Sequence, residues 1–167
     1  MSEQSQVQAT GIASEVITVQ LDEMKFIGIP VIVPFKDGDY STIGKTKQLF
    51  MERMDEIEGV INPSILWAPW YANDIMFTYV YSVQVASLDN VPEGMIGFTQ
   101  PAARYATTHY EGPLPWEPDP YERLQAYRQR EKLELAKGLM VLEKFEFDRE
   151  DDPDGLLYID VFGPIQG

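Results

Sequence analysis

Short runs of alternating apolar and polar residues dominate the chain and predict β-strands, with two stretches of helical periodicity between them. In the first half the strand-like runs are residues 16–21, 24–35, 65–72 and 75–86. Gly28 and Pro30 interrupt the second run, which suits a bulge or an edge position. Apolar residues recur at helical spacing from about Ser41 to Gly59, where glycine is expected to end a helix.

The same order of patterns begins again about 79 residues later. Placing residues 100–113 under the 24–34 region sets Phe26 against Tyr105 and Pro34 against Pro113. A second helix is expected from about Tyr121 to Lys132, followed by strands at 138–148 and 156–165. We therefore expect an α+β fold, a tandem repeat of strand-helix-strand-strand units that forms an antiparallel sheet with helices on one side and a central ligand cleft.

The domain organisation follows from the same patterns. Residues 1–14 are polar and predict a disordered tail, and residues 15–167 predict a single domain with repeats of about 15–87 and 93–166. The tail lacks the basic and apolar regions of a signal peptide, and no apolar run approaches the roughly 18 residues of a membrane span. We expect a cytoplasmic protein.

Glu143 departs from the pattern of the run 138–148. If this run is a strand, Glu143 shares a face with Leu139, Val141, Phe145 and Phe147. A carboxylate among apolar side chains must find a partner or keep its proton, which makes Glu143 a candidate for ligand binding or acid–base chemistry. Alternatively, Glu143 is a half-exposed edge residue, pairs with an arginine, or is turned to the other face by a bulge.

Composition removes several kinds of chemistry. The chain has no cysteine, which excludes disulfides, thiolate nucleophiles and zinc–thiolate sites, and it has one histidine, His109. We therefore expect no cofactor and no metal site. The net charge of −14 argues against direct binding of nucleic acid, because such proteins present lysine and arginine to phosphate.

Three segments, PAARYATTHYEGP, LEKF and YIDVFGPI, resemble the GyrI-like small-molecule binding domain, the effector-binding domain of bacterial transcription activators. The resemblance covers about residues 15–166 and implies a cleft at a pseudo-twofold axis. Relatives include the ligand-sensing halves of drug-responsive regulators, stand-alone binders of lipophilic cations, and hydrolases of alkylating cyclopropane natural products. By motif match the pocket glutamate of the cation binders corresponds to Glu143, while Asp160 stands where the terminal motif has glutamate.

Aromatic rings beside a buried carboxylate suit a delocalised organic cation, since each well-placed ring adds about 0.5–2 kcal/mol of cation–π attraction. Trp67 and Tyr81 are the leading candidates, because the first-half hairpin is expected to face Glu143 across the seam between the repeats. The further candidates are Tyr110, Tyr105, Tyr79, Tyr71 and Phe145. Core packing is the alternative for each ring.

The leading hypothesis is a stand-alone effector-binding protein that takes amphipathic, cationic or aromatic small molecules, without contacting nucleic acid or membrane. One alternative is a hydrolase of alkylating natural products with Glu143 as its catalytic residue, and another is a gyrase-inhibitor-like module that binds a protein partner. His109 suits either a surface hydrogen bond or catalysis. Asp160 suits either a second inward acid or the sheet edge.

Overall fold

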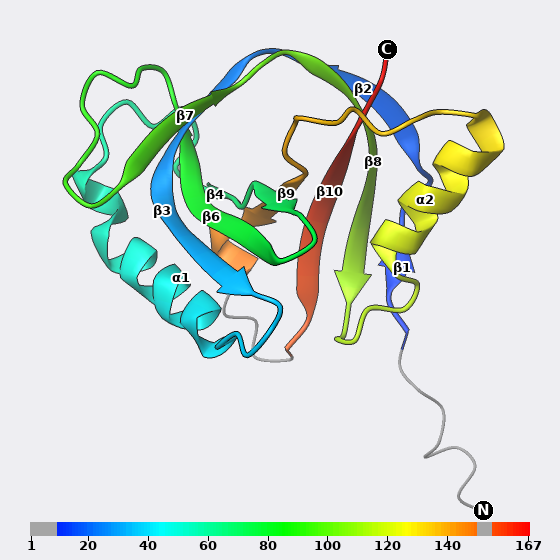
Figure 1. Ribbon diagram of the computed structural model, residues 1–167, viewed down its shortest axis with the longest axis horizontal. Helices are drawn as coiled ribbons and strands as arrows, with labels where there is room; N and C mark the ends of the chain where they lie inside the picture. The colour runs from blue at the N-terminus through cyan, green and yellow to red at the C-terminus, as the bar shows by residue number, and fades with distance from the viewer. Residues whose placement is uncertain (1–9, 150–154) are drawn as a thin grey trace, which may run out of the picture.

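The computed structural model describes residues 10–149 and 155–167, which form one large antiparallel sheet and two α-helices (Figure 1). The first half contains β1 (Ile12–Ala13), β2 (Ile17–Leu21), β3 (Met24–Pro34), α1 (Ser41–Arg53), β4 (Ile65–Trp67), β5 (Trp70–Ala72) and β6 (Met76–Val85). The second half contains β7 (Ile96–Gln100), β8 (Ala103–Gly112), α2 (Pro120–Glu131), β9 (Leu142–Glu146) and β10 (Leu157–Ile165). Short 3-10 helices follow α1 and β9, at Met54–Glu56 and Phe147–Arg149.

The two halves repeat the same elements, which confirms the predicted tandem fold. Strands β3 and β8 begin at Met24 and Ala103, and helices α1 and α2 begin at Ser41 and Pro120, so both pairs are 79 residues apart. The predicted disordered tail needs a correction, because β1 lies within it and pairs with β8. Residues 1–9 of that tail lie outside the described residues.

The sheet closes on itself through two long bent strands. Its order is β1-β8-β10-β9-β4-β6-β3-β7, and β2 also pairs with β8. The β2–β8 pair continues into the β3–β7 pair without a change of register, from Ile17 opposite Thr107 to Gly28 opposite Ile96. Figure 1 shows β2 and β7 arching over the top of the molecule, where each joins the long strand of its own half. Each half therefore covers a sheet edge of the other.

Both helices pack on the same face of the sheet. Helix α1 buries Phe50 against β3 and β6, and α2 buries Leu124 against β8 and β10. The central strands β4, β6, β9 and β10 lie between the two helices (Figure 1). We call this the helix-covered face. The opposite face has its own core, formed by Met24, Phe26, Trp67, Tyr105 and Leu142.

Local sequence explains where both helices begin. The Asp39 carboxylate accepts a hydrogen bond of 3.0 Å from the Ser41 backbone N–H, and the Asp119 carboxylate accepts one of 2.8 Å from the Tyr121 N–H. These bonds satisfy donors that a helix leaves free in its first turn. Pro120 is also suited to the start of α2, because a backbone N–H at this position would have no hydrogen-bond partner within the helix. The side chain of Tyr121 is thereby fixed at the first turn of α2.

Gly28 and Pro30 mark a change in the neighbours of β3. Up to Gly28 this strand pairs with both β6 and β7, and beyond it with β6 alone, so Pro30 lies in an edge segment as expected. A Cβ atom on Gly28 would lie 2.0 Å from the Tyr81 carbonyl oxygen, so glycine is required for the close approach of β6. Among the described residues, no helix is both long and apolar enough to span a membrane.

Candidate functional site

Glu143 lies in the middle of the helix-covered face, on the short central strand β9. Its neighbours across the sheet are Val161 on β10 and Ala68, whose backbone exchanges hydrogen bonds of 2.8 and 3.3 Å with that of Glu143. The residue is only 5% exposed. The predicted burial of this acid is therefore confirmed, and its carboxyl must find its partners inside the protein.

Two aromatic side chains from different halves meet at this carboxyl. The hydroxyl of Tyr121, on α2, donates a hydrogen bond to Oε2 of Glu143. The indole Nε1–H of Trp70, on β5, donates a bond of 2.9 Å to the Tyr121 hydroxyl. The ring of Tyr121 also packs edge-on against Trp70 and Trp116, with ring centroids 5.8 Å apart in each pair. Three aromatic rings thus cluster beside the buried acid.

Burial controls the protonation of this site. Loss of water raises the pKa of Glu143 from its ordinary 4.5 to about 8, although the nearby indole N–H of Trp70 opposes this rise by favouring the ionised form. Burial also raises the pKa of the Tyr121 hydroxyl. At neutral pH both groups are therefore neutral, and the Glu143 carboxyl keeps its proton.

Three hollows are lined in part by residues that neighbour Glu143 on β9 or pack around its carboxyl. The first, of about 230 Å³, is lined by Trp70, Tyr121, Leu124, Gln125, Arg128, Leu135, Val141 and Gly163. The second, of about 350 Å³, adjoins it and shares Trp70, Leu135 and Val141. The third, of about 210 Å³, lies between Lys47 of α1 and Leu114 before α2, with Phe145 in its lining. Glu143 itself lines none of these three hollows, because Tyr121 and Trp70 stand between its carboxyl and the first.

Four of the aromatic residues predicted from the sequence share the helix-covered face with Glu143. Tyr79 and Tyr81 lie on β6 with ring centroids 5.4 Å apart, and Phe145 is two residues from Glu143 on β9. Tyr110 is fully buried, and its hydroxyl donates a 2.6 Å bond to the Pro113 carbonyl oxygen. The hydroxyl of Tyr110 is thus engaged in holding the loop that leads to α2.

The remaining predicted rings lie elsewhere. Trp67 pairs with Lys144, so its side chain is on the opposite face from Glu143, where it contacts Phe26 and Phe162. Tyr105 lies in the same opposite core. The expected placement of Trp67 beside Glu143 is wrong. Strand β4 does pair with β9 across the seam, but the register of this pairing turns the Trp67 side chain to the opposite face. Tyr71 is exposed and lines the 350 Å³ hollow.

Tyr121, which contacts the acid, was not predicted from the sequence as a site residue, and neither were the two tryptophans that pack against it. Trp116 lies between the predicted strand region 100–113 and the second predicted helix, and Tyr121 was named only as the expected start of that helix. The Asp119-Pro120 helix start was a usable signal, since it places the next side chain at the first turn of α2. No local signal places Trp70, because its contact with Tyr121 joins residues 51 positions apart.

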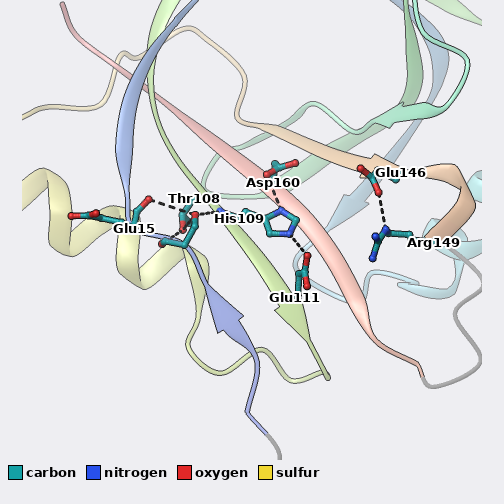
Figure 2. Close-up of polar contacts among 8 residues, drawn as sticks. Glu15, Thr108, His109, Glu111, Glu146, Arg149 and Asp160 are labelled. Atoms are coloured by element: carbon teal, nitrogen blue, oxygen red, sulfur yellow. Dashed lines mark hydrogen bonds and ion pairs between the residues drawn. The ribbon is translucent and has the colours of Figure 1, made fainter.

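His109 and Asp160 form a separate polar cluster. Figure 2 shows the His109 ring between two carboxylates, with Nδ1 2.9 Å from Asp160 and Nε2 3.0 Å from Glu111. Burial opposes protonation of the ring, but hydrogen bonds and charge attraction from Glu111 and Asp160 outweigh it and raise the pKa of His109. Asp160 lies opposite Lys144 in the sheet, so this cluster is on the opposite face from Glu143. Asp160 is therefore not a second acid in the Glu143 site.

Within residues 10–149 and 155–167, no group of three or more histidine, aspartate or glutamate side chains is arranged to hold a metal ion. The chemistry available at Glu143 is thus that of a neutral buried carboxyl, its tyrosine partner and surrounding rings. This arrangement suits recognition of an apolar guest that brings its own positive charge.

Comparison with known proteins identifies the family of this chain and solved structures with a similar fold. Residues 18–165 match the family model described as Cass2, integron-associated effector binding protein. The structure of SAV2435 bound to tetraphenylphosphonium is similar, with a TM-score of 0.67 and 14% identity over 92% of this chain and 95% of that one. The EcmrR C-terminal domain has a TM-score of 0.68 and 14% identity, covering 91% and 97% of the two chains. The integron cassette protein VCH_CASS2 of Vibrio cholerae has a TM-score of 0.61 and 11% identity, covering 93% and 99%.

These three likenesses establish the fold. A search of curated protein sequences finds no match.

Proposed function

Because the chain belongs to the family of integron-associated effector-binding proteins and is an effector-binding domain, we propose that its ligand is an amphipathic organic cation and that Glu143 is the anionic contact. The observation that carries this proposal is the burial of Glu143 beside three aromatic rings. A buried carboxyl next to rings gives a delocalised cation three sources of affinity, namely apolar burial, charge attraction and cation–π contact. The tetraphenylphosphonium bound to SAV2435 belongs to the same chemical class, which supports this choice of ligand.

Binding requires two changes in the site. The carboxyl loses its proton when the cation arrives, since the nearby positive charge then favours the ionised form. The Tyr121 side chain must also move, because it lies between Glu143 and the 230 Å³ hollow. Trp70 and Tyr121 then become part of the pocket wall. The cost of opening is an expected part of the binding free energy.

Titration with tetraphenylphosphonium tests the proposal. We expect Glu143→Gln to weaken binding at pH 8 by at least about tenfold, because an amide retains the shape and hydrogen bonding but not the charge. Glu146→Gln is the matched control, since Glu146 is on the same strand but is exposed and paired with Arg149 at 2.8 Å. Equal affinities for wild type and Glu143→Gln, measured by calorimetry, would reject the anionic role.

A hydrolase is the second candidate, and the raised pKa of Glu143 favours it. A carboxyl that keeps its proton at neutral pH can act as a general acid toward a strained ring opened by water. Incubation with an alkylating cyclopropane natural product separates the two functions. Several turnovers per protein molecule, lost in Glu143→Gln, support catalysis. Consumption of no more than one equivalent supports binding alone.

A further inference from the structure

One face of α2 forms a continuous wall of the 230 Å³ hollow. Tyr121, Leu124, Gln125 and Arg128 line it and are spaced at the intervals that bring side chains to one side of a helix. Tyr121 and Arg128 are two helical turns apart, about 10 Å along the axis. The wall thus has the tyrosine that covers Glu143 at one end and a guanidinium at the other.

Arg128 differs from three of the other five arginines of this chain. Arg53, Arg130 and Arg149 are each in an ion pair with a nearby glutamate. Within residues 10–149 and 155–167, no hydrogen bond or ion pair satisfies the guanidinium of Arg128, although the sequence has 27 acidic residues and 13 basic ones. Partial burial lowers the pKa of this guanidinium, so the cation has lost part of its hydration without gaining a counter-ion.

The floor of the hollow beside Arg128 is Gly163 of β10. A Cβ atom at this position would lie 3.5 Å from Cδ1 of Leu124 and 4.0 Å from Nη1 of Arg128. The guanidinium therefore lies close over a backbone without a side chain, and the space beside it stays open. Leu135 and Val141 supply the apolar remainder of the lining.

From this geometry we propose that the effector is zwitterionic, with a carboxylate or similar anionic group bound by Arg128 and its cationic end directed toward Tyr121 and Glu143. The inference rests on the proposed function and adds the second charge of the ligand. Guanidinium binds carboxylate through two parallel hydrogen bonds, and partial exclusion of water strengthens such a pair. The apolar body of the ligand lies against Leu124, Leu135 and Val141.

Rhodamine B and its ethyl ester provide a matched pair of probes. Both carry the same delocalised cation, but only rhodamine B has a free carboxylate. We expect wild-type protein to bind rhodamine B at least about fivefold more tightly than the ester in fluorescence anisotropy at pH 8, as one additional ion pair predicts. The preference is expected to disappear in Arg128→Gln and to remain in Arg130→Gln, which removes the same charge from the same helix.

The outcomes separate this inference from the proposed function. Equal affinity of wild type for the two dyes rejects the Arg128 site, as does an equal loss of preference in Arg130→Gln. Failure to bind either dye by a protein that still binds tetraphenylphosphonium through Glu143 also rejects it and leaves the proposed function standing. If Glu143→Gln weakens neither dye while Arg128→Gln removes the preference, the carboxylate site stands and the cation site fails. Gly163→Ala, whose added methyl has ordinary contacts, is expected to reduce binding of both dyes by narrowing the floor.

Discussion

The indole N–H of Trp70 donates a 2.9 Å hydrogen bond to the hydroxyl of Tyr121, joining a strand of the first half to the helix of the second. The same hydroxyl donates to Glu143. One tyrosine therefore holds both an indole from the first half and the buried acid of the second. The polar groups of this site satisfy one another while the ligand is absent.

Removing the Tyr121 hydroxyl is expected to destabilise the protein. Tyr121→Phe leaves the Trp70 N–H without its acceptor and Glu143 without its donor, which costs about 1–3 kcal/mol. Urea denaturation measures this change in the free energy of unfolding. Tyr127→Phe on the same helix is the control, and equal losses in the two variants would show that the hydroxyl of Tyr121 is not special.

Glu143 is expected to make stability fall as pH rises from about 4.5 to 8. Below this window the carboxyl is protonated in both states, and within it the unfolded chain ionises while the folded protein keeps its proton. The folded state loses about 1.4 kcal/mol per pH unit from this group, and the loss levels off above pH 8. Glu143→Gln has no such loss. The free energy of unfolding of the variant minus that of wild type should therefore increase from pH 5 to pH 8 in urea melts at pH 5, 6, 7 and 8. A difference that does not change with pH would contradict the raised pKa.

Affinity for tetraphenylphosphonium is expected to change in the opposite direction. Under the proposed function the cation binds the ionised carboxylate, so affinity should rise about tenfold per pH unit between pH 6 and 8 and then level off. Calorimetry in two buffers of different ionisation enthalpy should detect close to one proton released per ligand at pH 7. Glu143→Gln should bind with little dependence on pH, and a wild-type affinity that is flat over this range would exclude proton displacement.

The three tryptophans are expected to respond differently to ligand. Trp70 and Trp116 pack against Tyr121 on the helix-covered face, whereas Trp67 lies on the opposite face. Titration with tetraphenylphosphonium should therefore give the same quenching curve for Trp67→Phe as for wild type. The double variant Trp70→Phe, Trp116→Phe should lose most of the signal. Retention of strong quenching by Trp67 alone would move the ligand to the other side of the sheet.

The sequence was a good guide wherever the evidence was local or repeated. Helical spacing placed the start of the first helix at about Ser41, where α1 begins, and the second helix was expected from about Tyr121, one residue after its start at Pro120. Alternation along 138–148 placed Glu143 among apolar side chains, and of the alternatives left open the structure shows the buried position. These inferences depend on neighbours in the chain, whose geometry the backbone fixes.

Predictions that needed the register between distant strands were less successful. Trp67 follows the expected hairpin pattern, but the face it occupies is set by its pairing with Lys144, 77 positions away. A shift of one residue would have moved it to the other face. The contact of Tyr121 with Glu143 likewise depends on how α2 packs, which no run of residues encodes alone.

The unbroken pairing of β2–β3 with β7–β8 has a consequence for how the protein can be assembled. Each long strand lies in one half but forms backbone hydrogen bonds with the long strand of the other half. Neither half is therefore a self-contained folding unit. A chain cut within residues 87–94 should give two fragments that stay unfolded when expressed separately and recover the native spectrum when mixed. Folding would then require both fragments together. Ligand binding would detect their assembly, because Trp70 and Glu143 come from opposite sides of the cut.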